Sequence, residues 1–164
     1  MRKPTVDYRG FSLRKLNDPR FSHLKLLGGW LVYFAMYLIT EYLNPNNSGT
    51  AVSCSLDYKI PFLEIFVIPY VGWYLLIALS LLYFALYNVE NFKRLQIFII
   101  VTQVAAMIIY ITFPNFQPLR PDVYPRDNFL TDIVALLQTA DTNSNVYPSL
   151  HVAYSIGIAS ICFQ

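Results

Sequence analysis

Apolar residues along this chain gather in long blocks, instead of recurring at the spacing typical of a soluble core. The first block covers residues 26–43. The second covers 70–87 and follows an interfacial lead-in that we expect to end at Pro69. The third covers 95–113 and carries no charge. At about 1.5 Å per residue, each helix would cross or nearly cross a hydrocarbon core of ~30 Å.

A fourth apolar block starts near Pro148 and covers 148–164, where the sequence is still apolar, so we expect an interrupted span. Between the third and fourth blocks, residues 129–140 carry apolar side chains at helical spacing on one face. Asp127 or Asn128 could cap this helix. It should lie along the outer membrane interface. The pattern predicts an all-α polytopic membrane bundle with about four membrane-spanning helices and one short interfacial helix.

Composition supports the same class, because 55% of the residues are hydrophobic and only 13% are charged. Too few polar side chains remain to coat a soluble domain. We expect a single membrane domain over 26–164, preceded by a basic segment over 1–25. That segment has neither an apolar run nor a small-residue cleavage site, so the first span is read as an uncleaved anchor.

The distribution of lysine and arginine predicts the orientation. Residues 1–25 hold seven of them, the turn 88–94 holds two, and the loops 44–59 and 114–147 hold one and two. Because basic residues stay on the cytoplasmic side, we expect the N-terminus inside and the loops 44–59 and 114–147 outside, in the plasma membrane. The basic segment suits an anionic inner leaflet and is not evidence of nucleic-acid binding. Glu41, near the end of the first span, could reach lipid headgroups.

Other chemical signals are few. Cys54 and Cys162 have the spacing of neither a disulfide framework nor a metal site, and there is no Gly-rich phosphate loop. We therefore expect no metal and no cofactor. Residues 44–48 (NPNNS) have the composition of a turn.

Residues with chemical potential gather at two points of the second outer loop. The stretch 113–122 (FPNFQPLRPD) is stiffened by prolines and presents Gln117 and Arg120. The stretch 143–152 (NSNVYPSLHV) should open the fourth helix, with Pro148 in its first turn. Backbone N–H groups near Ser149 would then face an approaching phosphate.

Two side chains add to this anion site. His151 would sit in the first helical turn, where its imidazole can donate a proton to a leaving oxygen. Arg120 offers a planar, permanently charged fork for phosphate oxygens. Taken singly, each residue has a plainer interpretation, because such a histidine is usually an interface residue and such an arginine usually anchors a headgroup. Their occurrence at one membrane face, each beside a proline, favours a functional site.

The motif Tyr147 to Val152 (YPSLHV), together with the pair Arg120-Pro121, resembles the type 2 phosphatidic acid phosphatase superfamily. The resemblance implies a six-helix membrane enzyme that hydrolyses lipid phosphate monoesters or transfers phosphoryl head groups. It also implies a metal-free mechanism through a phosphohistidine. The Ser-Leu-His form is similar to the branch that includes the inositol-phosphoceramide synthases.

The resemblance implies that Arg120 and Ser149 bind phosphate and that His151 is the general acid. Where the family usually has a lysine seven residues before the arginine, this chain has Phe113, so Gln117 or Arg126 would assist Arg120. The third family motif, with the nucleophilic histidine, is absent, and the chain looks like the first two-thirds of a member. His23 cannot replace that histidine, because the charge distribution puts it on the opposite membrane face.

The sequence therefore predicts part of a lipid phosphatase or phosphotransferase whose site faces outward and whose substrate is a membrane lipid with a phosphate or phospho-head group. These residues alone should not turn over substrate. The alternative is a non-catalytic membrane module that binds anionic lipid or a protein partner through the same loop.

Overall fold

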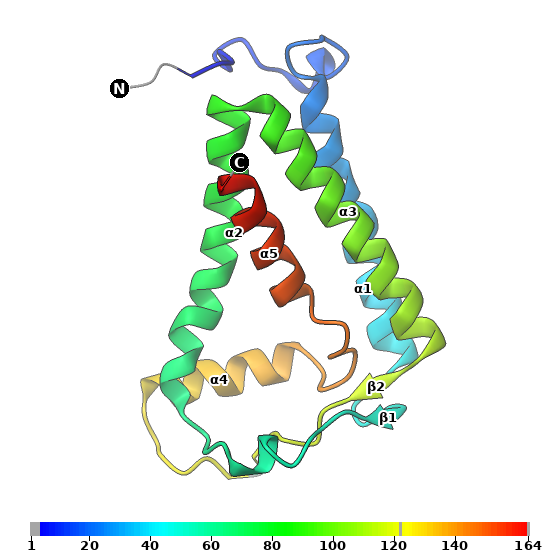
Figure 1. Cartoon of the computed structure of the whole chain (residues 1–164), viewed down its shortest axis with the longest axis vertical. Coiled ribbons are helices and arrows are strands. Elements are labelled where there is room, and N and C mark those ends of the chain that lie inside the picture. Colours follow the sequence, from blue (N-terminus) through cyan, green and yellow to red (C-terminus); the bar gives the residue numbers. More distant parts are fainter. Residues whose placement is uncertain (1–3, 122, 164) are drawn as a thin grey trace. The chain divides into compact units, whose positions relative to one another are not determined.

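The computed structural model describes residues 4–121 and 123–163. Asp122 and Gln164, together with Arg2 and Lys3 of the basic segment, lie outside the described residues. Within the described part, five α-helices form most of the structure (Figure 1). They are α1 (Gly28–Leu43), α2 (Val67–Tyr87), α3 (Val89–Thr112), α4 (Phe129–Ala140) and α5 (Leu150–Cys162). Short 3-10 turns cover Leu13–Lys15, Ser22–Leu27, Asp57–Lys59 and Glu64–Phe66, and the strands are β1 (Thr50–Ala51) and β2 (Asn115–Phe116).

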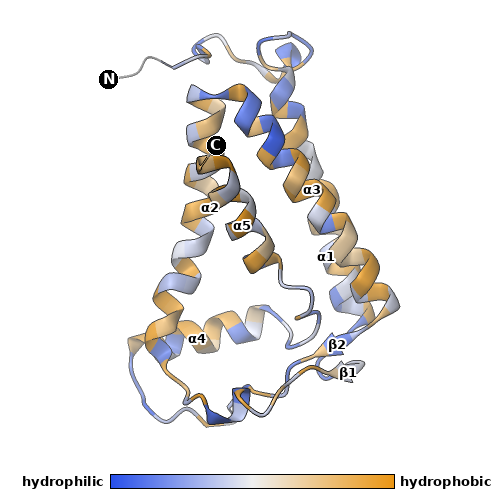
Figure 2. Ribbon diagram, viewed as in Figure 1, coloured by the Kyte–Doolittle hydropathy of each residue, from blue (hydrophilic) through white to orange (hydrophobic). Residues whose placement is uncertain are grey.

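Three helical stretches of the described chain are long and apolar enough to cross a membrane: Ser22–Leu43, Glu64–Tyr87 and Val89–Thr112. Their 22, 24 and 24 residues correspond to about 33 to 36 Å, against a hydrocarbon core of ~30 Å. Leucines stay exposed on them, such as Leu31 at 75% and Leu79 at 62%, and Figure 2 shows how much of these helices is hydrophobic. This mostly helical chain, with three long apolar helices, is compatible with a membrane bundle.

The start of α3 differs from the prediction. The predicted turn 88–94 is reduced to Asn88, and α3 begins at Val89. Asn88 caps the helix, because its Oδ1 accepts a hydrogen bond from the backbone N–H three residues later (3.1 Å). Glu90 and Arg94 pair one turn apart (3.4 Å). Charged residues that suggested a loop therefore belong to the first turns of a helix.

Prolines also lie differently from the prediction. Pro69 does not precede α2 but lies in its first turn, where the missing N–H costs no helical hydrogen bond. The predicted lead-in remains as the 3-10 turn Glu64–Phe66. Conversely, Pro148 was expected in the first turn of the fourth helix, but α5 begins at Leu150. With 13 residues, α5 is shorter than the three long helices.

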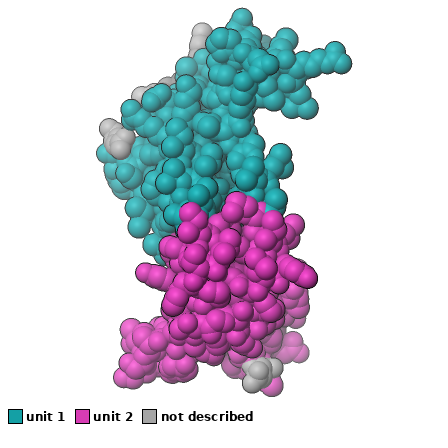
Figure 3. Space-filling model, turned by 90° about the vertical axis from the view of Figure 1, so that its right-hand side faces the viewer, with its two compact units in different colours: residues 1–35, 74–105, 150–164 teal, residues 36–73, 106–149 magenta. Residues whose placement is uncertain are grey.

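Two compact units make up the chain (Figure 3). In unit 1, α1 and α5 approach α3 at glycines: a Cβ at Gly29 would lie 2.9 Å from the side chain of Ile100, and one at Gly157 would lie 2.5 Å from Phe98. Four large α3 side chains in this unit are fully buried, namely Phe92, Leu95, Gln96 and Ile99. Unit 1 comprises residues 1–35, 74–105 and 150–164, and unit 2 comprises 36–73 and 106–149.

In unit 2, two loops far apart in sequence pair as short parallel strands, with Thr50 opposite Asn115. The pairing needs Gly49, which has φ +89° and whose Cβ would lie 2.0 Å from the Pro114 carbonyl oxygen. This contact was not predicted. The predicted turn at 44–48 is confirmed by the hydrogen bond from the Ser48 N–H to the Pro45 carbonyl (3.0 Å).

Candidate functional site

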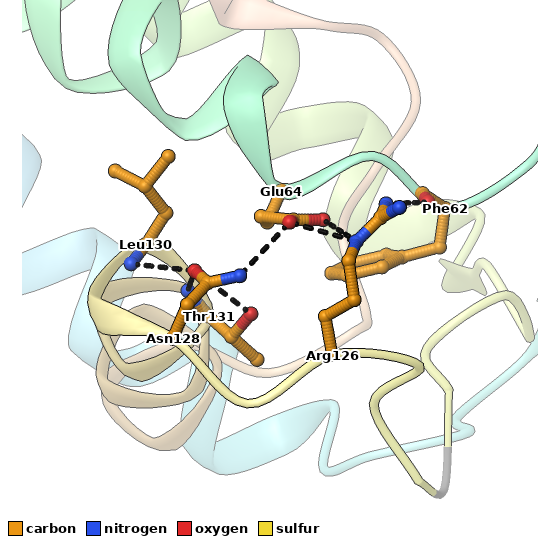
Figure 4. Close-up of polar contacts among 6 residues, drawn as sticks. All are labelled: Phe62, Glu64, Arg126, Asn128, Leu130 and Thr131. Carbon is orange, nitrogen blue, oxygen red and sulfur yellow. Dashed lines mark hydrogen bonds and ion pairs between the residues drawn. The ribbon is translucent and has the colours of Figure 1, made fainter.

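The helix α4 has the bounds that the sequence predicts, and Asn128 is its cap. The Asn128 Oδ1 accepts hydrogen bonds from the N–H groups of Leu130 (3.0 Å) and Thr131 (3.1 Å), as Figure 4 shows. The Nδ2 of the same side chain donates to the Glu64 carboxylate (3.0 Å). One asparagine thus begins α4 and ties it to the turn that precedes α2.

Arg126 lies at the same end of α4. Its Nε is 2.8 and 3.0 Å from the two oxygens of Glu64, and its Nη2 donates to the Phe62 carbonyl (3.4 Å) (Figure 4). The sequence interpretation had assigned Arg126 to a phosphate, but in the structure its charge is balanced by a carboxylate. The Arg126 side chain is 51% exposed, so solvent screens this pair and its contribution to stability is small.

Arg120 lies at the opposite end of α4. Its Nη1 donates to the carbonyls of Gln138 (3.0 Å) and Asp141 (2.8 Å), and its Nη2 donates to the carbonyl of Thr142. Carbonyls at a helix C-terminus carry partial negative charge, which a guanidinium stabilises. Three of the five N–H donors of Arg120 are therefore engaged in fixing the end of α4 and the residues that follow it.

The two arginines are separated by the length of α4. Because α4 has 12 residues, its ends are about 18 Å apart. In the structure each guanidinium is held at its own end of the helix. The assistance of Arg126 to Arg120 stays a prediction, and in this structure the two side chains are engaged at opposite ends of one helix.

Gln117 lies close to the segment that Arg120 holds. Its backbone N–H donates to the Asn143 carbonyl (3.0 Å), and the Asn143 Nδ2 donates back to the Gln117 carbonyl (3.3 Å). The same Nδ2 also donates to Asn47 Oδ1 (2.9 Å). Since Thr142 and Asn143 are consecutive, the Arg120 side chain and the Gln117 backbone bind neighbouring residues of one loop.

Asn115 fixes the backbone that leads into the Ser-Leu-His motif. Its side chain is fully buried; Nδ2 donates to the carbonyls of Tyr147 (2.8 Å) and Phe113 (3.0 Å), and Oδ1 accepts from the Tyr147 N–H (2.9 Å). The Tyr110 hydroxyl donates to the Pro148 carbonyl (2.7 Å). The end of α3 and β2 therefore position the two residues that precede Ser149.

The position of Glu41 near the end of a span predicts that it can reach lipid headgroups. In the structure its carboxylate binds this loop. Its two oxygens accept from Asn145 Nδ2 (3.0 Å) and from the Thr142 N–H (3.3 Å). Asn44 Nδ2 donates to Asn145 Oδ1 (2.9 Å). Asn145 has φ 59°, a left-handed conformation that asparagine tolerates better than most residues.

Ser149 and His151 flank the first residue of α5. Ser149 is exposed and lies directly before Leu150. His151 is half-buried, and its ring makes an edge contact with Tyr74 (centroids 6.2 Å apart). The carbonyl of His151 accepts from Ser155 Oγ (2.8 Å) within the helix. Ser149 belongs to unit 2 with the loop residues, and His151 belongs to unit 1.

The sequence does not predict that Glu41, Asn44 and Asn115 hold the loop together. A signal was present in retrospect, because asparagines are concentrated at the ends of the spans and in the loops that join them. Six of these side chains or their backbones take part in the loop contacts, namely Asn44, Asn46, Asn47, Asn115, Asn143 and Asn145. Their individual partners could not be read from the sequence.

Across residues 4–121 and 123–163, no group of three or more His, Cys, Asp or Glu side chains could hold a metal ion. No protein-family model, curated protein or solved structure matches this chain.

Proposed function

We propose that this chain carries the phosphate-binding part of a membrane enzyme that hydrolyses lipid phosphate monoesters or transfers phosphoryl head groups. The observation that carries the proposal is the position of Ser149-Leu150-His151 at the start of the apolar helix α5. An exposed serine directly before a helix N-terminus, where the positive end of the helix dipole attracts anions, is a suitable anion-binding element. His151 lies within that first turn.

Each residue has a distinct chemical role in this proposal. The first turn of α5 and Ser149 bind phosphate oxygens, and Arg120 neutralises their charge with donors that its backbone contacts leave available. His151 gives a proton to the departing alkoxide. The resemblance assigns the nucleophile to a further histidine outside these residues, which would attack phosphorus in line. Acyl chains of the substrate stay in the bilayer.

The proposed site faces outward from the plasma membrane, with the N-terminus in the cytoplasm. Support comes from nine of the twelve lysines and arginines, which fall in residues 1–25 and 88–94. A cysteine-accessibility experiment with an impermeant thiol reagent tests this orientation. On a background with Cys54 and Cys162 replaced, Ser53→Cys and Val123→Cys should be labelled in intact cells, and Arg94→Cys only after permeabilisation. The reverse pattern would place the loop inside.

A second candidate function is favoured by the contacts of Arg120 with three carbonyls. An arginine used in this way can be structural, in which case the chain would be a non-catalytic module that binds anionic lipid or a protein. The two functions make different predictions for lipid phosphate monoesters. Only the enzyme site should prefer a monoester to the diester of an ordinary phospholipid.

The test measures binding of short-chain phosphatidic acid to the chain in maltoside micelles, by calorimetry, with short-chain phosphatidylglycerol, an anionic diester, as the comparison. Losing a charge-assisted contact costs about 1.5 to 3 kcal/mol, so Arg120→Ala should weaken phosphatidic acid binding at least about tenfold. Lys59→Ala, which removes an exposed cation from another loop, is the matched control and should change little.

A stability measurement on the same variants separates the two roles of Arg120. If Arg120→Ala remains folded but binds the monoester less well, while Lys59→Ala does not, the phosphate site is supported. Equal affinity for monoester and diester, or undiminished affinity in folded Arg120→Ala, would contradict the enzyme proposal and leave the non-catalytic module.

A further inference from the structure

The basic N-terminal segment is not an extended tail but a folded element held on unit 1. The Thr5 N–H donates to the Leu86 carbonyl (2.7 Å), and its Oγ1 donates to the carbonyl of Tyr87 (2.9 Å). The Tyr8 hydroxyl donates to the Ala85 carbonyl (2.8 Å). These three carbonyls belong to the last turn of α2 and have no partner within their own helix. The segment therefore caps the C-terminus of α2.

Aromatic contacts fix the rest of the segment. Tyr8 Oη lies 2.7 Å from His23 Nε2, and the buried His23 ring packs edge-on against Phe92 in the second turn of α3 (5.5 Å). Phe21, also buried, contacts Tyr8 (5.8 Å) and Phe11 (5.4 Å). The segment is thus held at the junction of α2 and α3, at the ends of two long apolar helices (Figure 1).

The solvent-exposed side chains of this element include both charged and apolar groups. Leu13 is 77% exposed and Phe11 is 38% exposed, and basic residues surround them in the sequence. The described segment carries five cations against Asp7 and Asp18, a net charge of five minus two, or +3. The five are Arg9, Arg14, Lys15, Arg20 and Lys25, all of them exposed. Arg9, Phe11, Leu13, Arg14 and Lys15 are exposed and lie within seven consecutive positions, and we call them the N-terminal patch.

We propose that the N-terminal patch binds the anionic lipid surface that surrounds the ends of the helices, with Leu13 and Phe11 entering the interface and the cations contacting acidic headgroups. An exposed leucine is unfavourable in water, whereas lipid lies beside this end of the long helices. The positive charge complements an anionic leaflet and not a zwitterionic one. This inference does not depend on the phosphate site.

The experiment reads the position of Leu13 directly. An environment-sensitive dye is attached to Leu13→Cys on a background with Cys54 and Cys162 replaced, and the chain is placed in nanodiscs of phosphatidylcholine with 0 to 30 mol% phosphatidylserine. Nanodiscs present both leaflets, so the result is independent of orientation. The dye emission should shift to the blue as the acidic lipid increases, and lipid-borne quenchers should reduce it.

Charge variants give the quantitative test. Each cation near a membrane surface favours binding about fivefold, so Arg9→Gln with Arg14→Gln should lower the inserted-to-free ratio about 25-fold. Ser12, which is exposed and makes no side-chain cap, allows a matched pair. Ser12→Asp should lower the ratio about fivefold, and Ser12→Asn should not.

Emission that is the same at every phosphatidylserine content would overturn the proposal and leave the patch to a protein partner. So would a response to acidic lipid that Arg9→Gln with Arg14→Gln does not reduce. A change common to Ser12→Asp and Ser12→Asn would show an effect of packing rather than charge, which also contradicts the proposal.

Discussion

Replacing Asn115 should disrupt the entry to the Ser-Leu-His motif more than any exposed substitution. Its buried side chain makes three hydrogen bonds, two of them reciprocal with the backbone of Tyr147. Each hydrogen bond contributes about 1 kcal/mol net, so Asn115→Ala should lower the free energy of unfolding by about 3 kcal/mol. Asn17→Ala, the same change at an exposed position, should stay within about 0.5 kcal/mol.

The substitution Asn115→Asp separates hydrogen-bond chemistry from volume. The ionised carboxyl has no donor and would face the carbonyls of Tyr147 and Phe113, so the loss should exceed that of Asn115→Ala near pH 7. Burial raises the pKa of the introduced carboxyl, and its protonated form regains one donor. A group whose pKa is raised in the folded state stabilises the fold fully below its unfolded pKa, and this stabilisation is lost as pH rises through the folded pKa. The stability of Asn115→Asp relative to the parent chain should therefore recover as the pH falls from 7 to about 4.

Reversible unfolding in mixed micelles, followed by circular dichroism over this pH range, measures both effects. The reasoning would be refuted if Asn115→Ala cost no more than Asn17→Ala. It would also be refuted if the Asn115→Asp deficit were independent of pH, because the reciprocal contact with Tyr147 would then not carry the stability.

Three further predictions concern the backbone and the caps. Gly49→Ala should destabilise unit 2 by more than about 2 kcal/mol, because a Cβ would overlap the Pro114 carbonyl at positive φ. Gly72→Ala in α2, where the added Cβ meets open space, should be neutral or stabilising. Unfolding titrations of the two variants compare these effects. Asn128→Ala should cost about 1 kcal/mol through the lost cap, and Asn128→Asp should keep the cap but repel Glu64, a penalty that salt reduces. Burial raises the pKa of the Tyr8 hydroxyl above 10.0. The stabilisation that the neutral hydroxyl contributes is therefore complete below pH 10 and is lost as pH rises through the raised pKa. Protease cleavage of the N-terminal segment should increase in that pH range, and Tyr8→Phe should lack this pH dependence.

The elements with a local signal could be predicted from the sequence. The apolar spacing of 129–140 and the preceding Asn128 identify α4 correctly, because a cap and an amphipathic face depend only on neighbouring residues. The start of α3 could not be predicted in the same way. There, charged side chains suggested a loop, but the cap at Asn88 and the Glu90–Arg94 pair extend the helix beyond its apolar block.

The contacts of the candidate site residues could not be predicted from the sequence. The sequence indicates Arg120, Gln117 and Ser149 only by residue type, and in the structure the Arg120 side chain and the Gln117 backbone bind neighbouring residues of one loop. That Arg120 would bind the carbonyls at the end of α4 depends on how residues about 20 positions away fold back. The pairing of Thr50 with Asn115 is equally non-local, since two-residue strands leave no periodic pattern.

The most direct test of the phosphate site is a set of distances from phosphorus to Arg120 and to His151. Phosphatidic acid bound to the chain in frozen maltoside micelles, which contain no phosphorus, allows rotational-echo NMR between ³¹P and labelled arginine or histidine. The spectra of Arg120→Lys and His151→Gln assign the signals. We predict that both residues lie within about 5 Å of phosphorus, as charge-assisted hydrogen bonds require. Coupling to neither residue, with the ligand demonstrably bound, would contradict the account.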